Sequence, residues 1–406
     1  MLKNQYPVDQ ENSTRLIKND NEALLVAKTL AEYYEKDAAE RDEKRTPPEN
    51  EMERFASSGL LGCTLPVAYG GADISLTTLV EIIRVISEAD PSIGQIPLTH
   101  FEAINSLKTL GSDAQKRLYF KRILAGERFG SASSERNTKH ARDIKTTLNR
   151  HESRFILNGT KFYCAGSQFS QWLQVLALDD NSQLTRVLVP TNGIGVTLHN
   201  DWSGFGQRTT GSGSIVFDQV SVNEMQILPA HKLYDNQLSL QGAYVQLLHA
   251  AIDAGIASAA LSDTMEFVKT KSRPWIDSGK EAAADDPYIV AAIGLLSVKQ
   301  KAALGLLRKA ACTLDRFKDS SVSAEVSAEV SVTVGEARIL TMQIALDASQ
   351  KLFELAGTGS TLSQHGLDRH WRNARTHTLH DPIRWKYKIV GSYWLNDEFP
   401  QRHSFI

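Results

Sequence analysis

Residues 157–166 read Leu-Asn-Gly-Thr-Lys-Phe-Tyr-Cys-Ala-Gly and lie in a β-rich region that decides the fold. Within this stretch Asn158-Gly159 is a turn dipeptide, and similar turn residues stand at 179–181 and 192–193. Between the turns, short runs rich in β-branched and aromatic residues predict strands at Arg154–Asn158, Trp172–Leu178, Thr185–Val189 and Ser214–Val220. About 100 residues of this kind predict a compact antiparallel β-domain.

Helical patterns flank the β-region on both sides. Behind Asp20, which we expect to be a capping residue, apolar residues recur at helical spacing to about Lys44. Ser75 can cap a second amphipathic run. After the β-region, long helical patterns occur in the number required for a four-helix bundle, at 240–271, 287–316, 333–356 and 382–396.

The order of helices, strands and helices predicts an α+β fold with three consecutive domains. We place an α-helical domain at 1–125, a β-barrel or sandwich domain at 126–235 and a four-helix-bundle domain at 236–406. Ser323–Val332, a tandem Ser-Ala-Glu-Val duplication, is interpreted as a variable loop or a helix start.

Composition excludes several classes of protein. With 45 basic and 47 acidic residues the net charge is −2, which gives no general attraction to nucleic acid or to anionic lipid. No apolar run approaches the roughly 18 residues that cross a bilayer, and residues 1–14 lack the pattern of a signal peptide. The three cysteines are far apart and form no CxxC pair, which predicts neither a disulfide framework nor structural zinc. We therefore expect a cytoplasmic protein.

Several catalytic motifs are missing from the sequence. Neither GxGxxG nor GxxxxGK[ST] occurs, and Gly357-Thr358-Gly359-Ser360 is better interpreted as a turn that ends a helix. GxSxG and HExxH are missing too. His377 and His380, followed by Asp381, could share a helical face as metal ligands, but no further ligand has suitable spacing, so we predict no metal site.

Motifs along the chain resemble those of the acyl-CoA dehydrogenase superfamily. Residues 65–71 (LPVAYGG) resemble its P-x-x-Y-G-G loop, and residues 132–135 (ASSE) resemble its A-L-T-E segment along the flavin. Residues 157–166 resemble its L-N-G-x-K-x-W-I-T-x-G motif. Because the motifs occur in this order and spacing, the resemblance implies an acyl-CoA-dehydrogenase-like fold for nearly the whole chain.

Further motifs resemble one branch of that superfamily, the reduced-flavin monooxygenases of sulfur compounds. These are Trp202 with residues 206–209 (GQRT), residues 272–275 (SRPW), and above all residues 371–382 (WRNARTHTLHDP). The branch includes dibenzothiophene monooxygenases and the sulfur-acquisition oxidoreductases of dimethyl sulfone metabolism. The resemblance implies a homotetrameric enzyme that takes reduced FMN (FMNH2) from a separate NAD(P)H:flavin reductase and inserts one oxygen atom of O2 at sulfur.

The resemblance also implies catalytic histidines. A flavin monooxygenase needs a proton or hydrogen-bond donor beside the bound oxygen, and histidine exchanges a proton near neutral pH. His380 is the first candidate, His377 is its neighbour, and His100 matches a further histidine of the N-terminal helical domain. Where a dehydrogenase carries a glutamate base, this chain has Asp381, which is one methylene shorter and precedes Pro382.

The same resemblance implies a set of flavin-binding residues. Arg273 would pair with the cofactor phosphate, in its own or in a neighbouring subunit, since arginine makes forked contacts with phosphate. The others would contact the flavin ring or its edge and are Ser131, Ser133, Ser134, Tyr163, Ala165 and Trp202.

Two alternatives stay open at the level of sequence. One is an FAD-dependent acyl-CoA dehydrogenase. The other is a non-catalytic flavin-binding scaffold, because Ala165 and Gly359 stand where relatives carry a hydroxyl residue and an arginine. The sulfur compound is not identified, since the pocket volume depends on the loops at 229–237 and 278–285.

Overall fold

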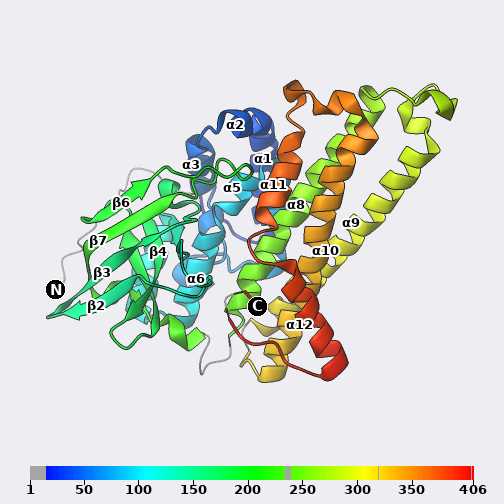
Figure 1. Cartoon of the computed structure of the whole chain (residues 1–406). Coiled ribbons are helices and arrows are strands. Elements are labelled where there is room, and N and C mark those ends of the chain that lie inside the picture. The colour runs from blue at the N-terminus through cyan, green and yellow to red at the C-terminus, as the bar shows by residue number, and fades with distance from the viewer. Residues whose placement is uncertain (1–14, 234–238, 319, 404) are drawn as a thin grey trace.

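The computed structural model describes residues 15–233, 239–318, 320–403 and 405–406. The β-sheet lies at one end of the molecule, and the N-terminal helices lie between it and the long C-terminal helices (Figure 1). The start without a signal-peptide pattern (1–14), the proposed boundary at 235/236 and the end of the 229–237 loop lie outside these residues. The N-terminal helices are α1 Asp20–Glu35, α2 Ala38–Lys44, α3 Glu49–Ser57, α4 Leu76–Ala89, α5 Pro91–Gln95, α6 Leu98–Leu110 and α7 Asp113–Leu124.

The first predicted helix is divided in two. It is interrupted after Glu35, and its N-cap is Asn19, whose side chain accepts from the Glu22 amide at 3.0 Å, so the prediction of Asp20 as the cap was wrong. The break lets the buried guanidinium of Arg41 on α2 reach the Asp90 carboxylate at 3.1 Å. Ser75 caps α4 as predicted, by accepting from the Thr78 amide.

The middle of the chain folds into a mixed sheet, not a purely antiparallel one. The strand order is β6-β7-β3-β2-β4-β5-β8, and β1 also pairs with β4. Both β1 and β2 run parallel to β4, and β1 is a four-residue strand with too little pattern to be recognised. The strands are β1 Phe129–Ala132, β2 Thr147–His151, β3 Arg154–Lys161, β4 Trp172–Asp179, β5 Leu184–Pro190, β6 Val196–His199, β7 Ser214–Val222 and β8 Ile227–Leu228.

The C-terminal part contains three very long helices and two shorter ones. The third begins at Ala324, earlier than predicted, because Ser323 caps it and the four-residue repeat places Val326 and Val330 on one helical face. The duplication is therefore helical, and a helix before the last one was missed. The helices are α8 Gln241–Thr270, α9 Pro287–Phe317, α10 Ala324–Ala356, α11 Asp368–His377 and α12 Ile383–Asn396.

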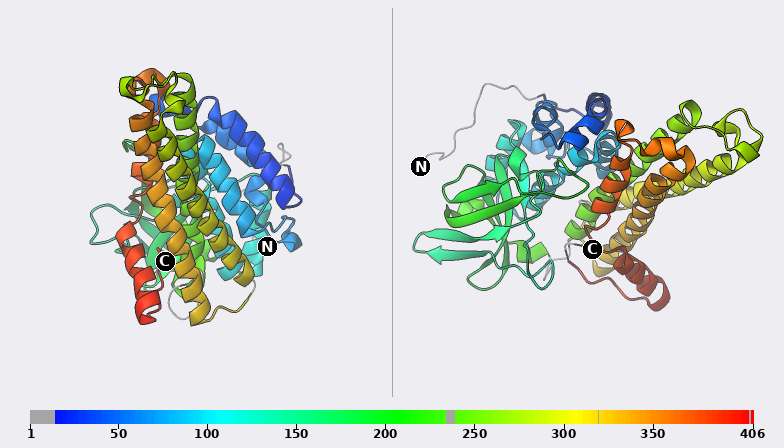
Figure 2. Two further views of the ribbon diagram at one scale, coloured as in Figure 1. Left: turned by 90° about the vertical axis from the view of Figure 1, so that its right-hand side faces the viewer. Right: turned by 45° about the horizontal axis from the view of Figure 1, so that its top comes forward.

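Helix α8 connects the two helical groups. It packs against α10 on one side and against α4 of the N-terminal group on the other (Figure 2). Gly255 permits the close approach to α4, since a Cβ at this position would lie 2.6 Å from the Arg84 carbonyl oxygen. This packing fixes the face of α8 that points toward the sheet.

Among the described residues, two helices have the length and apolar composition to cross a membrane, so the expectation that no apolar run approaches this length was too strict. In α8 most of the apolar window is buried inside the protein, whereas in α9 little of it is. The exposed apolar side chains of α9 include Tyr288, Val290, Leu295 and Val298.

Candidate active site

A pocket of about 1200 Å³ lies where the sheet meets both groups of helices. Its walls come from α6, β1 and the loop after it, the loop around Trp202, α8 and the turn between α11 and α12. Pockets for one small ligand usually measure about 300–1000 Å³, so this one has room for two adjacent ligands. Eight of the predicted site residues line it: Ser131, Ser133, Ser134, Tyr163, Ala165, Trp202, His377 and His380.

Aromatic side chains form one wall of the pocket. Tyr163 follows β3 with a φ of +62°, a conformation that is uncommon for a residue other than glycine. Its ring centroid lies 6.2 Å from that of Trp202. The Trp202 indole donates to the Gln207 carbonyl oxygen at 2.8 Å, which fixes the plane of the ring. This wall suits a planar aromatic ligand.

The segment 371–382 holds the opposite wall in place. On α11, the Asn373 side chain accepts from the Gln207 amide at 2.6 Å, which ties the helix to the Trp202 loop. Gly206 is required there because a Cβ would lie 1.9 Å from the Arg372 carbonyl oxygen. Helix α11 ends at His377, so His380 belongs to the following turn and the two histidines do not share a helical face.

Three histidines gather on this wall. His377 Nε2 lies 3.0 Å from His249 Nδ1, and the rings of His249 and His380 are 3.9 Å apart between centroids. His380 is the most accessible, with a side chain that is 34% exposed. Burial, reinforced by the neighbouring His380, lowers the pKa of His249 well below its ordinary value. This wall thus contains one accessible histidine, His380, backed by two buried ones.

Asp381 is engaged in ion pairs. Its Oδ1 accepts from the Arg338 guanidinium at 2.8 Å, and its Oδ2 lies 3.2 Å from Lys386 Nζ. Burial opposes the ionised form, but these cations hold the pKa of Asp381 well below its usual range. Asp381 does not line the pocket, and a carboxylate held in this way is a weak base. The geometry disfavours α-proton abstraction by Asp381.

Polar atoms without partners point to a ligand with hydrogen-bonding edges. Within the described parts of the chain, both amide atoms of Gln207 and the hydroxyl of Thr376 are buried and make no hydrogen bond, and both residues line the pocket. Gln207 also has a φ of +51°. Buried polar groups are normally satisfied, so these atoms fit a bound molecule with donors and acceptors.

The structure does not bring His100 and Arg273 to the pocket. His100 is buried on α6, where its Nε2 bonds the Leu61 carbonyl oxygen at 3.0 Å and its Nδ1 accepts from the Phe129 amide at 3.3 Å. Burial lowers the pKa of His100 to about 4. Arg273 is exposed just beyond the end of α8.

Sequence reasoning missed two residues of the site, His249 and Gln207. His249 is one turn of α8 before Asp253, and this i, i+4 pair of a histidine and a carboxylate was the available signal. Gln207 was quoted only as part of a motif, and its unpaired amide becomes visible only in three dimensions.

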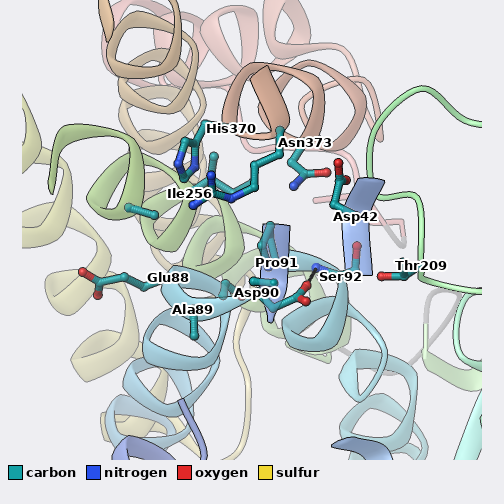
Figure 3. A pocket seen from close by; sticks show the side chains of 14 residues that line it. Asp42, Glu88, Ala89, Asp90, Pro91, Ser92, Thr209, Ile256, His370 and Asn373 are labelled. Atoms are coloured by element: carbon teal, nitrogen blue, oxygen red, sulfur yellow. Dashed lines mark hydrogen bonds between the residues drawn. The ribbon is translucent and has the colours of Figure 1, made fainter. Parts of the chain in front are cut away.

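A second cavity, of about 10 Å³, lies between α5, α8 and α11 and has room for a single water molecule. His370, Asn373 and Asp90 line it (Figure 3). No group of three or more His, Cys, Asp or Glu side chains in the described ranges is arranged to hold a metal ion. The large pocket is therefore the candidate active site.

The chain belongs to the acyl-CoA dehydrogenase family. The family's N-terminal domain matches residues 22–127, its middle domain residues 131–220 and its C-terminal domain residues 247–385. The large pocket is formed by residues from all three matched regions.

Individual relatives are monooxygenases by name. Dibenzothiophene monooxygenase of Rhodococcus qingshengii is 34% identical, over 94% of this chain and 95% of that protein. A probable FMNH2-dependent monooxygenase of Pseudomonas putida, SfnC, is 30% identical over 93% of this chain and 96% of the relative. The crystal structure of FMN-bound TdsC from Paenibacillus sp. A11-2 superposes with a TM-score of 0.91 at 30% identity, covering 95% of this chain and all of TdsC.

Proposed function

We propose that this chain is the oxygenase of a two-component flavin system, which uses reduced FMN and O2 to oxygenate sulfur in a small organosulfur compound. The observation that carries the proposal is the large pocket, in which an accessible histidine and a pair of aromatic rings face a space with room for a flavin and a substrate. The family membership and the names of the relatives support the same chemistry.

The residues present fit FMN. The hydroxyls of Ser131, Ser133 and Ser134 have no hydrogen-bond partner among the described residues, and the unpaired amide of Gln207 adds a donor and an acceptor. Trp202 and Tyr163 would contact the ring. Ala165 has no hydroxyl, and its carbonyl oxygen accepts from the Ser131 amide at 3.0 Å, so it acts by holding the segment that carries Ser131. Arg273 is exposed, and we propose that it contacts the phosphate of FMN bound by a second subunit.

Reduced FMN, when bound, supplies the electron pair that converts one atom of O2 to water while the other atom goes to sulfur. His380, whose side chain is accessible from the pocket, would supply a proton to oxygen from a ring nitrogen. His377 lies behind it and is bonded to α8. Apolar side chains such as Leu98, Leu248 and Phe405 keep water away from the reacting atoms.

The partners follow from this chemistry. Because no nicotinamide-binding motif is present, a separate NAD(P)H:flavin reductase would supply FMNH2. We propose a homotetramer in which the exposed apolar face of α9 and the exposed aromatic residues of α12 are covered. A cytoplasmic location stays a prediction. Dehydrogenase chemistry is less favoured because Asp381, the nominal base, is held in ion pairs. A non-catalytic flavin-binding scaffold is also less favoured, because the named relatives are enzymes.

The test is substitution of His380. In H380A we expect oxygenation to be lost while the affinity for FMN stays within about tenfold, the scale of one modest contact. H365A is the matched control, since His365 lies outside the pocket. Rapid mixing of the anaerobic complex with reduced FMN against oxygen should show a delay before oxidised FMN absorbs. Unchanged turnover in H380A would remove His380 from the mechanism, and oxidation at the rate of free FMN in the wild type would refute the proposed function.

A further inference from the structure

A buried chain of hydrogen bonds leads from α10 through α8 and α11 to the pocket wall. Arg338 Nη1 donates to Asp253 Oδ2 at 2.5 Å, and Asp253 Oδ1 lies 2.6 Å from His377 Nδ1. His377 Nε2 then lies 3.0 Å from His249 Nδ1. Arg338 and Asp253 are fully buried, and His249 is 6% exposed at the pocket.

The donors and acceptors in this chain can be assigned in one direction. Arg338 has only donors, and its buried positive charge pairs with Asp253 as a carboxylate. That carboxylate is an acceptor, and therefore His377 must donate from Nδ1. In neutral His377 the other nitrogen, Nε2, is then an acceptor, so His249 must donate to it from Nδ1. His249 Nε2 is left with its lone pair free.

His249 Nε2 is the end of the chain and has no hydrogen-bond partner among the described residues. The charged or titratable groups around this ring are Asp253 on α8, Arg338 on α10, His377 on α11, and His380 and Asp381 in the turn after it. Burial is the main cause that lowers the pKa of His249, and the permanent charge of Arg338 acts in the same sense against Asp381, so the neutral form of His249 is favoured. Because the Nδ1–H of neutral His249 is used by His377, the ring presents only the acceptor Nε2 to the pocket.

We propose that Asp253 and His377 are positioning residues that hold His249 as a hydrogen-bond acceptor for an N–H group of reduced FMN. The inference rests on the proposed function, because it takes FMN as the ligand. Sulfides, sulfoxides, sulfones and sulfinate anions carry no N–H or O–H donor, so the organosulfur substrate is the wrong partner for this atom. Reduced isoalloxazine carries a ring N–H that the oxidised ring lacks. We place the acceptor at a ring N–H that only the reduced form carries, not at the ring N–H that both forms share, and it therefore favours the reduced cofactor over the oxidised one.

The experiment compares the affinity of the intact protein for reduced and oxidised FMN, measured anaerobically, together with the two-electron potential of bound FMN. In H249N the amide can still donate to His377, but nothing reaches the position of Nε2. We expect the preference for reduced FMN to fall by about five- to tenfold, the worth of one hydrogen bond. A tenfold fall corresponds to a potential that is about 30 mV more negative. In H249Q the longer amide returns an acceptor to that position, so the preference should stay within about threefold of wild type.

D253N tests the assigned direction of donation along this chain of hydrogen bonds. Arg338 will keep the amide oxygen, because it needs an acceptor, and the amide nitrogen will then face His377. Both histidines must reverse their tautomers, and His249 Nε2 becomes a donor. We expect D253N to lose the preference for reduced FMN to the same extent as H249N. The matched control is D263N, because Asp263 on α8 also bonds a buried histidine of α11, His370, at 2.7 Å, but lies outside the pocket.

The outcomes separate the two proposals. If wild type binds reduced FMN and oxygenates a sulfur compound, but folded H249N and D253N keep its preference and potential, this inference is overturned and the proposed function stands. Equal losses in H249Q and H249N would also overturn it, because packing and not the acceptor would then be responsible. If wild type neither binds reduced FMN nor oxygenates, the proposed function itself fails. Circular dichroism and thermal melting establish that each variant is folded.

Discussion

The buried ion pair between Lys161 and Glu135 allows the sharpest stability prediction. Lys161 Nζ lies 2.6 Å from Glu135 Oε1 and 3.2 Å from the Ser133 carbonyl oxygen, and its side chain is fully buried. Replacing lysine by methionine keeps the volume but leaves a buried carboxylate without its cation. Removing one partner of such a pair typically costs about 3–5 kcal/mol. Three hydrogen bonds to Glu135, from Thr146 and from the Lys145 amide, remain in K161M, so we expect the low end, about 3 kcal/mol.

The assay is equilibrium unfolding in urea at pH 7, with K145M as the control. Lys145 is exposed and pairs only with Asp143 among the described residues, so K145M should lie within about 0.5 kcal/mol of wild type. In the double variant E135Q/K161M the uncompensated charge is gone, and we expect recovery of at least about 1 kcal/mol relative to K161M. A K161M protein as stable as K145M would refute the reasoning, and so would a double variant with purely additive losses.

Two more predictions concern buried or paired groups elsewhere. H100F should lose about 2–3 kcal/mol of unfolding free energy in urea, because the Phe129 amide loses its acceptor, whereas FMN affinity should change little; the reverse pattern would place His100 at the cofactor. Burial alone would raise the pKa of Asp263, but the hydrogen bond from His370 and the charge of Arg369 together outweigh it and lower that pKa to about 2. Its folded value lies below the unfolded one, so this carboxylate stabilises the protein above about pH 4, and the contribution is lost as the pH falls toward 2. Because the side chain is partly exposed we expect about 1 kcal/mol, seen as a shallower fall of the melting temperature between pH 5 and 3 in D263N than in wild type; parallel curves would contradict it.

Local signals predicted most of the regular structure. Ser75 at a cap, the apolar spacing of α8 and the β-branched runs of β4 and β5 act within a few residues, and the structure confirms them. The mixed sheet was not predictable in this way, because the parallel pairing of β1 with β4 joins segments more than 40 residues apart. The interruption between α1 and α2 accompanies a tertiary ion pair between Arg41 and Asp90, which joins residues far apart in the sequence.

In the candidate site, too, local motifs predicted some residues, whereas others depend on tertiary contacts. Motifs predicted the residues of the aromatic wall and the two histidines at 377 and 380, and the pocket brings them together. His249 carries no motif, and its role depends on the crossing of α8 and α11, which places it beside a residue 128 positions later. His100 matched by pattern, yet backbone groups occupy both of its nitrogens.

The way in which the pocket is assembled also constrains how the protein can be made in the cell. Its walls draw on residues from Gln95 to Phe405, so no single region contains it. A ribosome adds roughly 5–20 residues per second, and regions that emerge early can fold while later ones are still being translated. The helices before the sheet and the sheet itself can form first, but the histidine wall arrives only with α11 and the turn after it. A nascent chain therefore has no closed site in which reduced flavin could meet oxygen and be oxidised to no purpose.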